Sequence, residues 1–415
     1  MSRRARITVM TSGHLSTCPR MLKAADALSA DGHDVRVVAT NHVPWAADAD
    51  ADVRSRRRWP VTTVDYARSS SGFTYWRTGV RYRASRAAAE SMGAERLPFP
   101  IAARAFGRVH AELVDAAMSS AADFIYGGTT GALAAVADSA RRRGVPYAVD
   151  LEDLHSGETA GADAAVTDAL ATRIEREVLR GAAFVTTSSE AIGRVYGERY
   201  GVAPAVVHNT FSLPAAAPDF ARADRSTFRV YWFSQTIGPG RGLEDAVVAL
   251  GRAGGRAELT LQGGPQPGYL DALTALAREH APLTTIVHQQ PVPPDSMIDA
   301  ARGYDVGLAL EQMVPLNRQL CVTNKAFTYI LAGVAVAMTD TPGQHALGLD
   351  LGEGAQLVAP GDVDALAAAL GRWMREPARL DCAKRAAWSA ARRRWHWEHE
   401  LERGRLCALV REAVS

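Results

Sequence analysis

The sequence predicts an α/β protein made of two domains, each with a parallel sheet. Short apolar runs alternate with amphipathic stretches along both halves of the chain, and this alternation is typical of βαβ units. The length of 415 residues suits two domains of ordinary size. Ser212 to Thr227 is rich in Ala, Pro and Asp and is predicted to link them. We therefore predict a first domain over 1–211 and a second over 228–395.

Composition excludes several classes of protein. Hydrophobic residues make up 47% and charged residues 22% of the chain, as in ordinary globular domains. The net charge of +2 gives no reason to expect a nucleic-acid partner. The four cysteines have the spacing of neither a zinc site nor a disulfide framework: Cys18, Cys321, Cys382 and Cys407. Reduced thiols predict a cytoplasmic protein. Ile7 to Met10 is too short an apolar run for a signal peptide or a membrane span.

The first domain is predicted to open with a βαβ unit: strand Arg6 to Met10, helix Pro19 to Ala30 and strand Val35 to Ala39. Further strands are predicted over 61–66, 123–126, 146–151, 183–187 and 205–208. Asp163 is a predicted N-cap for a helix over 164–180.

Residues 41–120 show little regular alternation. Within them, aromatic residues are interleaved with arginines: Trp76, Arg77, Arg81, Tyr82, Arg83 and Arg86. Two interpretations stay open. One is a solvated helix surface, and the other is a face that docks on an anionic membrane or holds an anionic acceptor.

The second domain continues the alternation. Strands are predicted over 229–233, 258–262, 284–288, 306–310, 334–338 and 356–358, with helices between them. A last helix is predicted through Leu401, Leu406 and Val410. His396 and His399 have no third ligand near them in the sequence, so we expect no metal site there.

The stretch from Glu311 to Gly333 predicts an anion site. It follows the strand over 306–310, and Thr323-Asn324 are good N-cap residues for a short helix that follows. A helix that begins at the carboxyl end of a parallel strand presents free N–H groups and a positive dipole end to a ligand. Lys325 adds a positive charge. This is the chemistry of a diphosphate pocket.

A Gly-rich turn predicts a second part of that pocket. It follows the strand over 229–233 and reads Ser-Gln-Thr-Ile-Gly-Pro-Gly-Arg-Gly, with Gln235 early and Gly240-Arg241-Gly242 late. Glycines let the backbone approach a phosphate closely, and an arginine binds two oxygens at once. Such a turn by itself indicates little, and it indicates a phosphate site only when paired with the stretch from Glu311 to Gly333.

At these residues the chain resembles the GT-B glycosyltransferases of family 4. The matching residues are Glu311, Asn324-Lys325-Ala326-Phe327, Tyr329, Gly333 and Arg241. Two positions depart from the family pattern. Thr328 stands where the family has a ribose-binding Glu, and Gln235 stands where it has a first phosphate-binding cation.

The resemblance implies two Rossmann-like α/β/α domains that face each other across a cleft, with a final helix over about 396–415 crossing back to the first domain. It implies an enzyme that transfers a sugar from a nucleotide-sugar donor with retention of configuration, without a metal or other cofactor. Glu311 would be catalytic by positioning the sugar. The donor contacts implied are Arg241, Lys325, Asn324, Thr323, Gln235, Gly240, Thr328 and Gly13.

In the first domain the resemblance points to two loops at strand ends. Asp153 and His155 would join the catalytic set, and the acceptor-side residues would be His14, Glu152 and Arg20. Two other interpretations stay open. His14 could be a solvent-facing loop residue, and the acidic loop could cap the helix after it.

Two alternatives to a transferase also stay open. A sugar-nucleotide 2-epimerase has two similar domains and uses acids and histidines, as in Glu152-Asp153-Leu154-His155. A non-catalytic partner subunit would account for Thr328 and Gln235. The donor base, sugar and acceptor are not identified. We expect an anionic or membrane-linked acceptor, in envelope polysaccharide, glycolipid or specialised-metabolite biosynthesis, and contact with the inner face of the membrane.

Overall fold

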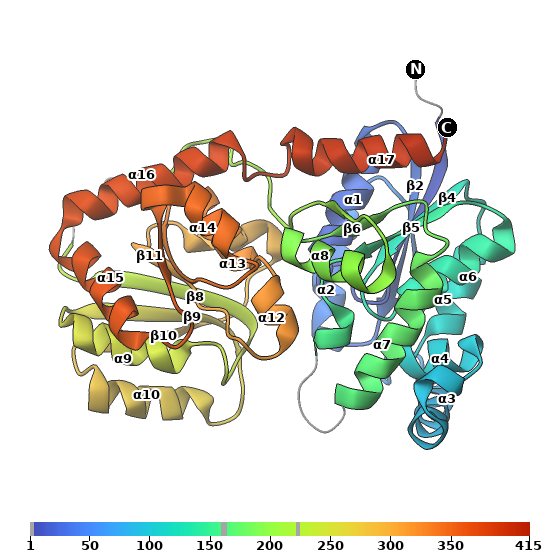
Figure 1. The fold of residues 1–415 in the computed structure, drawn as a ribbon, viewed down its shortest axis with the longest axis horizontal. Coiled ribbons are helices and arrows are strands. Elements are labelled where there is room, and N and C mark those ends of the chain that lie inside the picture. The colour runs from blue at the N-terminus through green and yellow to red at the C-terminus, as the bar shows by residue number, and fades with distance from the viewer. Residues whose placement is uncertain (1–3, 159–163, 221–224) are drawn as a thin grey trace. The chain divides into compact units, whose positions relative to one another are not determined.

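A computed structural model describes residues 4–158, 164–220 and 225–415. The chain divides into two compact units (Figure 1). The first comprises residues 1–208 and 400–415, and the second comprises 209–399. Each unit has its own parallel sheet.

The first unit is built on a seven-stranded parallel sheet in the order β3-β2-β1-β4-β5-β6-β7. Its strands are β1 (Arg6–Thr11), β2 (Asp34–Asn41), β3 (Val61–Asp65), β4 (Phe124–Gly128), β5 (Tyr147–Leu151), β6 (Val185–Thr187) and β7 (Ala205–Val206). β1 pairs with β2 on one side and with β4 on the other. The strand order therefore reverses at β1, so the loops after β1 and β4 lie where ligands bind in such sheets.

Helices connect these strands: α1 (Pro19–Ala30), α2 (Pro44–Ser55), α3 (Gly72–Met92), α4 (Phe99–Phe106), α5 (His110–Met118), α6 (Leu133–Arg143), α7 (Ala164–Leu179) and α8 (Glu190–Tyr200). Residues 41–120 are thus far more regular than the sequence predicts, since α2 to α5 lie there. α3 has only four buried residues in 21, so it lacks the apolar periodicity that identifies a helix. The predicted N-cap Asp163 lies outside the described residues.

The end of the chain returns to the first unit. A π-helical turn, η5 (Glu400–Gly404), leads into α17 (Arg405–Ala413), and Arg411 lies 3.5 Å from Asp31 after α1. Buried Glu402 accepts hydrogen bonds from the His208 backbone at 2.5 Å and pairs with its Nδ1 at 2.9 Å. The final helix therefore packs on the first unit, as the resemblance implies.

The second unit is built on a six-stranded parallel sheet in the order β10-β9-β8-β11-β12-β13. Its strands are β8 (Phe228–Ile237), β9 (Ala257–Pro265), β10 (Thr284–Gln289), β11 (Val306–Ala309), β12 (Ala335–Thr339) and β13 (Ala355–Val358). Its helices are α9 (Leu243–Ala253), α10 (Tyr269–His280), α11 (Met297–Ala301), α12 (Leu316–Leu320), α13 (Asn324–Ala332), α14 (His345–Leu351), α15 (Val363–Arg375) and α16 (Pro377–Arg393). Two cores form (Figure 1). α9, α10 and α15 cover one face of the sheet, and α11, α13 and α14 cover the other. α16 contributes to both cores, with Leu380 and Ala383 in the first and Ala387 in the second.

Candidate functional site

The carboxyl ends of β8 and β11 set the position of a site in the second unit. β8 pairs with β9 on one side and with β11 on the other, so the strand order reverses between β8 and β11. A crevice opens at such a reversal in parallel sheets, outside the carboxyl ends of the strands. The Gly-rich turn follows β8, and Glu311 follows β11. The fold therefore brings the two predicted stretches to the same edge of one sheet.

Glu311 and Lys325 form a buried ion pair at this edge. Lys325 Nζ lies 2.9 Å from Glu311 Oε1, and both side chains are about nine-tenths buried. Burial alone would raise the pKa of Glu311. The charge of Lys325 and hydrogen bonds from Lys325 and Thr323 outweigh burial, so the pKa is lowered. Glu311 is therefore an ionised acceptor, suited to hold hydroxyl groups.

The N-terminus of α13 faces the site without a side-chain cap. Thr323 occupies the N-cap position, but its hydroxyl bonds to Lys325 Nζ at 3.2 Å and to Glu311 instead of to the helix. The first N–H groups of a helix have no partner within the helix. The amides of Asn324 and Lys325 can therefore bind an anion, whereas the Ala326 N–H donates to the Thr323 carbonyl at 3.1 Å.

The Gly-rich turn brings Arg241 to the same edge. Gly240 and Gly242 adopt the left-handed conformation, with φ of 67° and 72°. A Cβ on Gly242 would lie 2.8 Å from the Cβ of Leu310, so only glycine fits there. Arg241 is half-buried, and its pKa is lowered first by burial and then by the charge of Arg318. Both effects disfavour the charged form of Arg241, so an anion bound beside it would stabilise that form.

The two positions that depart from the family pattern differ in exposure. β8 runs to Ile237, beyond the predicted end at Phe233, with a register shift between Phe233 and Thr236. Gln235 lies in this irregular part and is exposed. Thr328 is fully buried in α13, and its hydroxyl donates to the Asn324 carbonyl at 3.0 Å. In this conformation Thr328 offers no surface to a ligand, and its donor contact stays a prediction.

Sequence reasoning missed a cation on α12. Arg318 donates from Nη1 to the carbonyl of Gly240, the residue before Arg241. By the resemblance, the spacing from Glu311 to Thr328 is longer than the family's usual one, and Pro315 just before α12 is a helix-start signal. Those two features could have located this helix.

His14 in the first unit is buried, so the solvent-facing interpretation is wrong. Its Nδ1 lies 3.0 Å from Asp50 Oδ2, and its Nε2 accepts from the backbone N–H groups of His42 and Val43 at 3.1 and 3.0 Å. Ser16 bonds to the same carboxylate through its N–H and its hydroxyl, at 2.8 and 2.7 Å. Both ring nitrogens are thus bound within the unit, and a role in acceptor binding stays a prediction.

Arg20 is likewise bound within the first unit. Its Nε and Nη2 lie 2.5 and 2.7 Å from the carboxylate of buried Asp150. Nη1 donates to the Val207 carbonyl at 2.5 Å. Burial lowers the pKa of Arg20, but Asp150 outweighs burial and raises it. These bonds hold β5 to the end of β7 and leave Arg20 little capacity for an acceptor.

Gly13 packs tightly nearby, since a Cβ there would lie 2.5 Å from Cys18 Sγ.

The predicted Glu152-Asp153-His155 loop follows β5 and gathers polar groups. His155 is buried, bonds to Glu158 through Nδ1 and lies 3.1 Å from the Thr130 hydroxyl. Burial lowers its pKa, but the Glu158 carboxylate outweighs burial and raises it to about 9. Burial also raises the pKa of Glu152 to about 7, with Asp153 adding to the effect. A protonated His155 and an easily protonated Glu152 are suited to proton exchange.

A neighbouring loop shows backbone strain. Thr129, after β4, has φ of 75°, in the left-handed region. Its hydroxyl lies 3.0 Å from the Ser12 backbone N and 2.9 Å from the Ser12 hydroxyl in the loop after β1. Strained residues of this kind cluster at functional sites. The strand reversal in the first unit is thus a second candidate site, on the predicted acceptor side.

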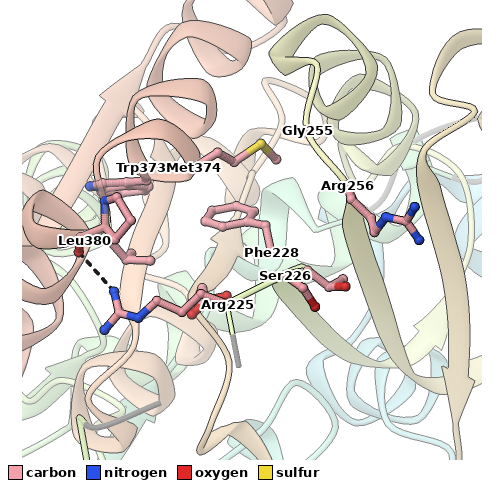
Figure 2. Close-up of a pocket in the computed structure, with 11 residues that line it drawn as sticks. Arg225, Ser226, Phe228, Gly255, Arg256, Trp373, Met374 and Leu380 are labelled. Carbon is pink, nitrogen blue, oxygen red and sulfur yellow. Dashed lines mark hydrogen bonds between the residues drawn. The ribbon is translucent and has the colours of Figure 1, made fainter. Parts of the chain in front are cut away.

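A pocket in the second unit lies at the opposite edge of the sheet. Figure 2 shows its apolar floor of Phe228, Trp373 and Leu380 and its rim of Arg225 and Arg256. Its volume is about 150 Å³, whereas ligand pockets usually measure about 300–1,000 Å³. It is therefore too small for a nucleotide-sugar. Among the described residues, no group of three or more His, Cys, Asp or Glu could hold a metal ion.

Comparisons with known proteins identify a domain of the first unit and the fold of the chain. Residues 19–210 match the family described as "Glycosyl transferase 4-like domain". No curated protein matches the sequence.

Solved structures match over nearly the whole chain. HepE of Anabaena in complex with UDP-glucose has a TM-score of 0.67 at 15% identity, over 99% of each chain. Sucrose-phosphate synthase from Thermosynechococcus elongatus has a TM-score of 0.65 at 14% identity, over 99% of each chain. A trehalose-6-phosphate structure from E. coli, bound with UDP-2-fluoro glucose, has a TM-score of 0.63 at 12% identity, over 99% of each chain. At such identities the likeness establishes a shared fold.

Proposed function

We propose that this chain, which has a glycosyl transferase 4-like domain over residues 19–210 and the fold of GT-B proteins, transfers a sugar from a nucleotide-sugar donor to an acceptor. We further propose that the anomeric configuration is retained. The observation that carries the proposal is the edge of the second sheet, where Arg241, the Glu311–Lys325 pair and the N-terminus of α13 surround the ends of β8 and β11.

The residues of this edge have distinct roles in the proposal. Arg241 and the α13 amides bind the donor diphosphate and offset the charge that builds on it as the glycosidic bond breaks. Lys325 keeps Glu311 ionised, and Glu311 holds sugar hydroxyls and so positions the donor. Because protein cations balance the diphosphate, we propose that no metal takes part.

The donor is tested first by a thermal-shift panel of UDP, GDP, dTDP and ADP with their common sugars. A ligand that binds only the folded state raises the melting temperature. UDP-glucose is the first candidate, because a HepE structure of the same fold holds it. One clear winner supports the proposal. A flat panel contradicts it and favours a non-catalytic partner subunit.

Turnover without an acceptor separates transfer from epimerisation. The loop with Glu152, Asp153 and His155 keeps a sugar-nucleotide 2-epimerase as the second candidate, because its groups with raised pKa values could move protons. Incubation of the winning donor alone, followed by analysis of the sugar, decides the point. Consumption that requires an added acceptor supports transfer, and a new epimer without acceptor supports epimerisation.

We propose that α3 docks on an anionic membrane that carries the acceptor. Phe73, Trp76 and Val80 lie on one face of this helix and are 79%, 55% and 58% exposed. Arg68 lies 5.9 Å from the Trp76 ring, and Arg77 lies 5.9 Å from the Phe73 ring. Apolar side chains beside arginines are typical of interfacial helices. No helix in the described part of the chain could cross a bilayer.

Vesicle sedimentation tests this docking. Phe73→Ser/Trp76→Ser should abolish binding to phosphatidylserine vesicles. Leu349→Ser, which changes a side chain of the second unit that is 64% exposed, should leave it unchanged. Wild-type protein that ignores such vesicles would contradict the proposal. Wild-type dimers that the double substitution dissociates would instead assign the face to a second copy.

A further inference from the structure

The edge of the second sheet lacks one of the cations that the family pattern leads us to expect. Gln235, at the early position of the Gly-rich turn, is neutral and exposed. Lys325 is close by, but its charge is already balanced by Glu311 at 2.9 Å. Arg241 would then face a diphosphate with the helix amides alone.

Arg318 lies beside the turn at which this cation is missing. It lies on α12, and its Nη1 donates to the carbonyl of Gly240, next to Arg241 in the chain. A Cβ built on Gly240 would lie 3.9 Å from that same Nη1, so the guanidinium lies against the Gly-rich turn. The contact fixes the guanidinium at the turn and leaves its other N–H groups available to a ligand.

Arg318 and Arg241 are two like charges held close together at the Gly-rich turn. Within 4–158, 164–220 and 225–415, no ion pair joins either guanidinium to a carboxylate, although the charge of Glu311 acts on both. Burial first, and then the charge of Arg318, lower the pKa of Arg241, as expected for two cations held together in a partly buried place. Like charges at close range cost energy unless an anion lies between them. The three cations and one carboxylate at this edge leave two net positive charges, which matches the two negative charges of a nucleotide-sugar diphosphate.

We propose that Arg318 is a donor-binding residue that contacts the diphosphate together with Arg241, in place of the cation missing at Gln235. The inference rests on the proposed function and adds a residue to that site. It also accounts for the segment between Glu311 and Asn324. α12 lies within that segment and places the guanidinium of Arg318 at the turn.

Calorimetry of the full chain tests the inference. The probe is whichever of UDP, GDP, dTDP and ADP the wild type binds best. Arg318→Ala should weaken binding about ten- to a hundredfold, because a charge-assisted hydrogen bond is lost. Binding of the corresponding nucleoside, which has no phosphate, should not change. Arg256→Ala, an exposed arginine at the opposite edge of the same sheet, is the matched control and should bind as the wild type does.

A second substitution tests whether the cation at position 318 replaces the one missing at position 235. Gln235→Arg in the Arg318→Ala protein should recover most of the lost affinity, because it returns a cation to the turn. Failure to recover would overturn the exchange between positions 235 and 318. Arg318→Lys keeps the charge and should lose less affinity than Arg318→Ala, which also excludes a general folding defect of α12.

The outcomes separate this inference from the proposed function. Wild-type binding that Arg318→Ala leaves unchanged overturns the role of Arg318 alone. A wild type that binds no nucleoside diphosphate overturns the proposed function and this inference with it.

Discussion

Lys325 Nζ lies 2.9 Å from Glu311 Oε1, in a pair that joins the first turn of α13 to the end of β11. Removing one partner leaves the other charge buried, which is strongly destabilising. Lys325→Met and Glu311→Gln should therefore each destabilise the second unit, and the double variant should lose less stability than the sum of the two single losses. We expect a coupling energy of about 1–3 kcal/mol from urea unfolding of the single and double variants.

The exposed pair Arg252–Asp364 gives the control for this cycle, with side chains 51% and 84% exposed. Its cycle should give less than about 1 kcal/mol, because solvent screens such pairs. Equal coupling in the two cycles would show that burial does not strengthen the Glu311–Lys325 pair.

Arg241→Ala should separate binding from stability. Its charge is disfavoured by burial and by Arg318, so the ligand-free variant should melt no lower than the wild type. Its affinity for the preferred nucleoside diphosphate should fall about ten- to a hundredfold. Melting curves with and without the nucleotide measure both effects. A variant with full affinity would remove Arg241 from the site.

Gly242→Ala should destabilise the second unit by more than Gly254→Ala. Both glycines have φ above 70°, so each substitution carries the strain of the left-handed region, about 1–2 kcal/mol. A Cβ at Gly254 meets nothing within 4 Å, whereas one at Gly242 meets Leu310 and Gln312 at 2.8 Å. Chemical denaturation of both variants isolates the packing cost. Equal losses would mean that the turn moves aside without penalty.

Asp50→Ala should loosen the loop after β1. Burial raises the pKa of Asp50, but hydrogen bonds from His14 and Ser16 outweigh burial and lower it. Loss of these buried bonds should destabilise the first unit by about 2–3 kcal/mol. Asp48→Ala, on the exposed side of α2, should change stability by less than about 0.5 kcal/mol. Similar unfolding midpoints for the two variants would contradict a structural role for His14.

The raised pKa of His155 predicts a pH dependence of stability. Below its ordinary pKa of 6.5 the ring is protonated in both the folded and unfolded states, so its pairing with Glu158 contributes fully. That contribution is lost as the pH rises through about 9. The wild type should therefore exceed Glu158→Gln in stability by about 1–3 kcal/mol more at pH 6 than at pH 9. Urea unfolding at several pH values measures this difference, and Glu177→Gln, a half-buried residue of α7 that makes no contact with His155, should show none of it.

The sequence alone predicted the elements with one clearly buried face. Pro19–Ala30 has the predicted bounds of α1, because its apolar residues repeat with the helical period and a proline marks its start. The N-cap at Thr323 was predicted for the same kind of local reason. Residues 41–120 gave no such signal, because most of α3 faces solvent and its apolar side chains Phe73, Trp76 and Val80 are exposed.

The sequence by itself also determined the chemistry at each strand end, because parallel strands bring their carboxyl ends to one edge and the residues that follow can be read in order. Only the tertiary structure decided which polar groups remain for a ligand. Asp50 and Asp150 engage His14 and Arg20 across 36 and 130 residues, while Arg318 reaches Gly240 across 78. Whether a hydrogen-bonding group is satisfied within the protein depends on the partner that the fold places beside it, and spacing in the sequence does not contain that partner.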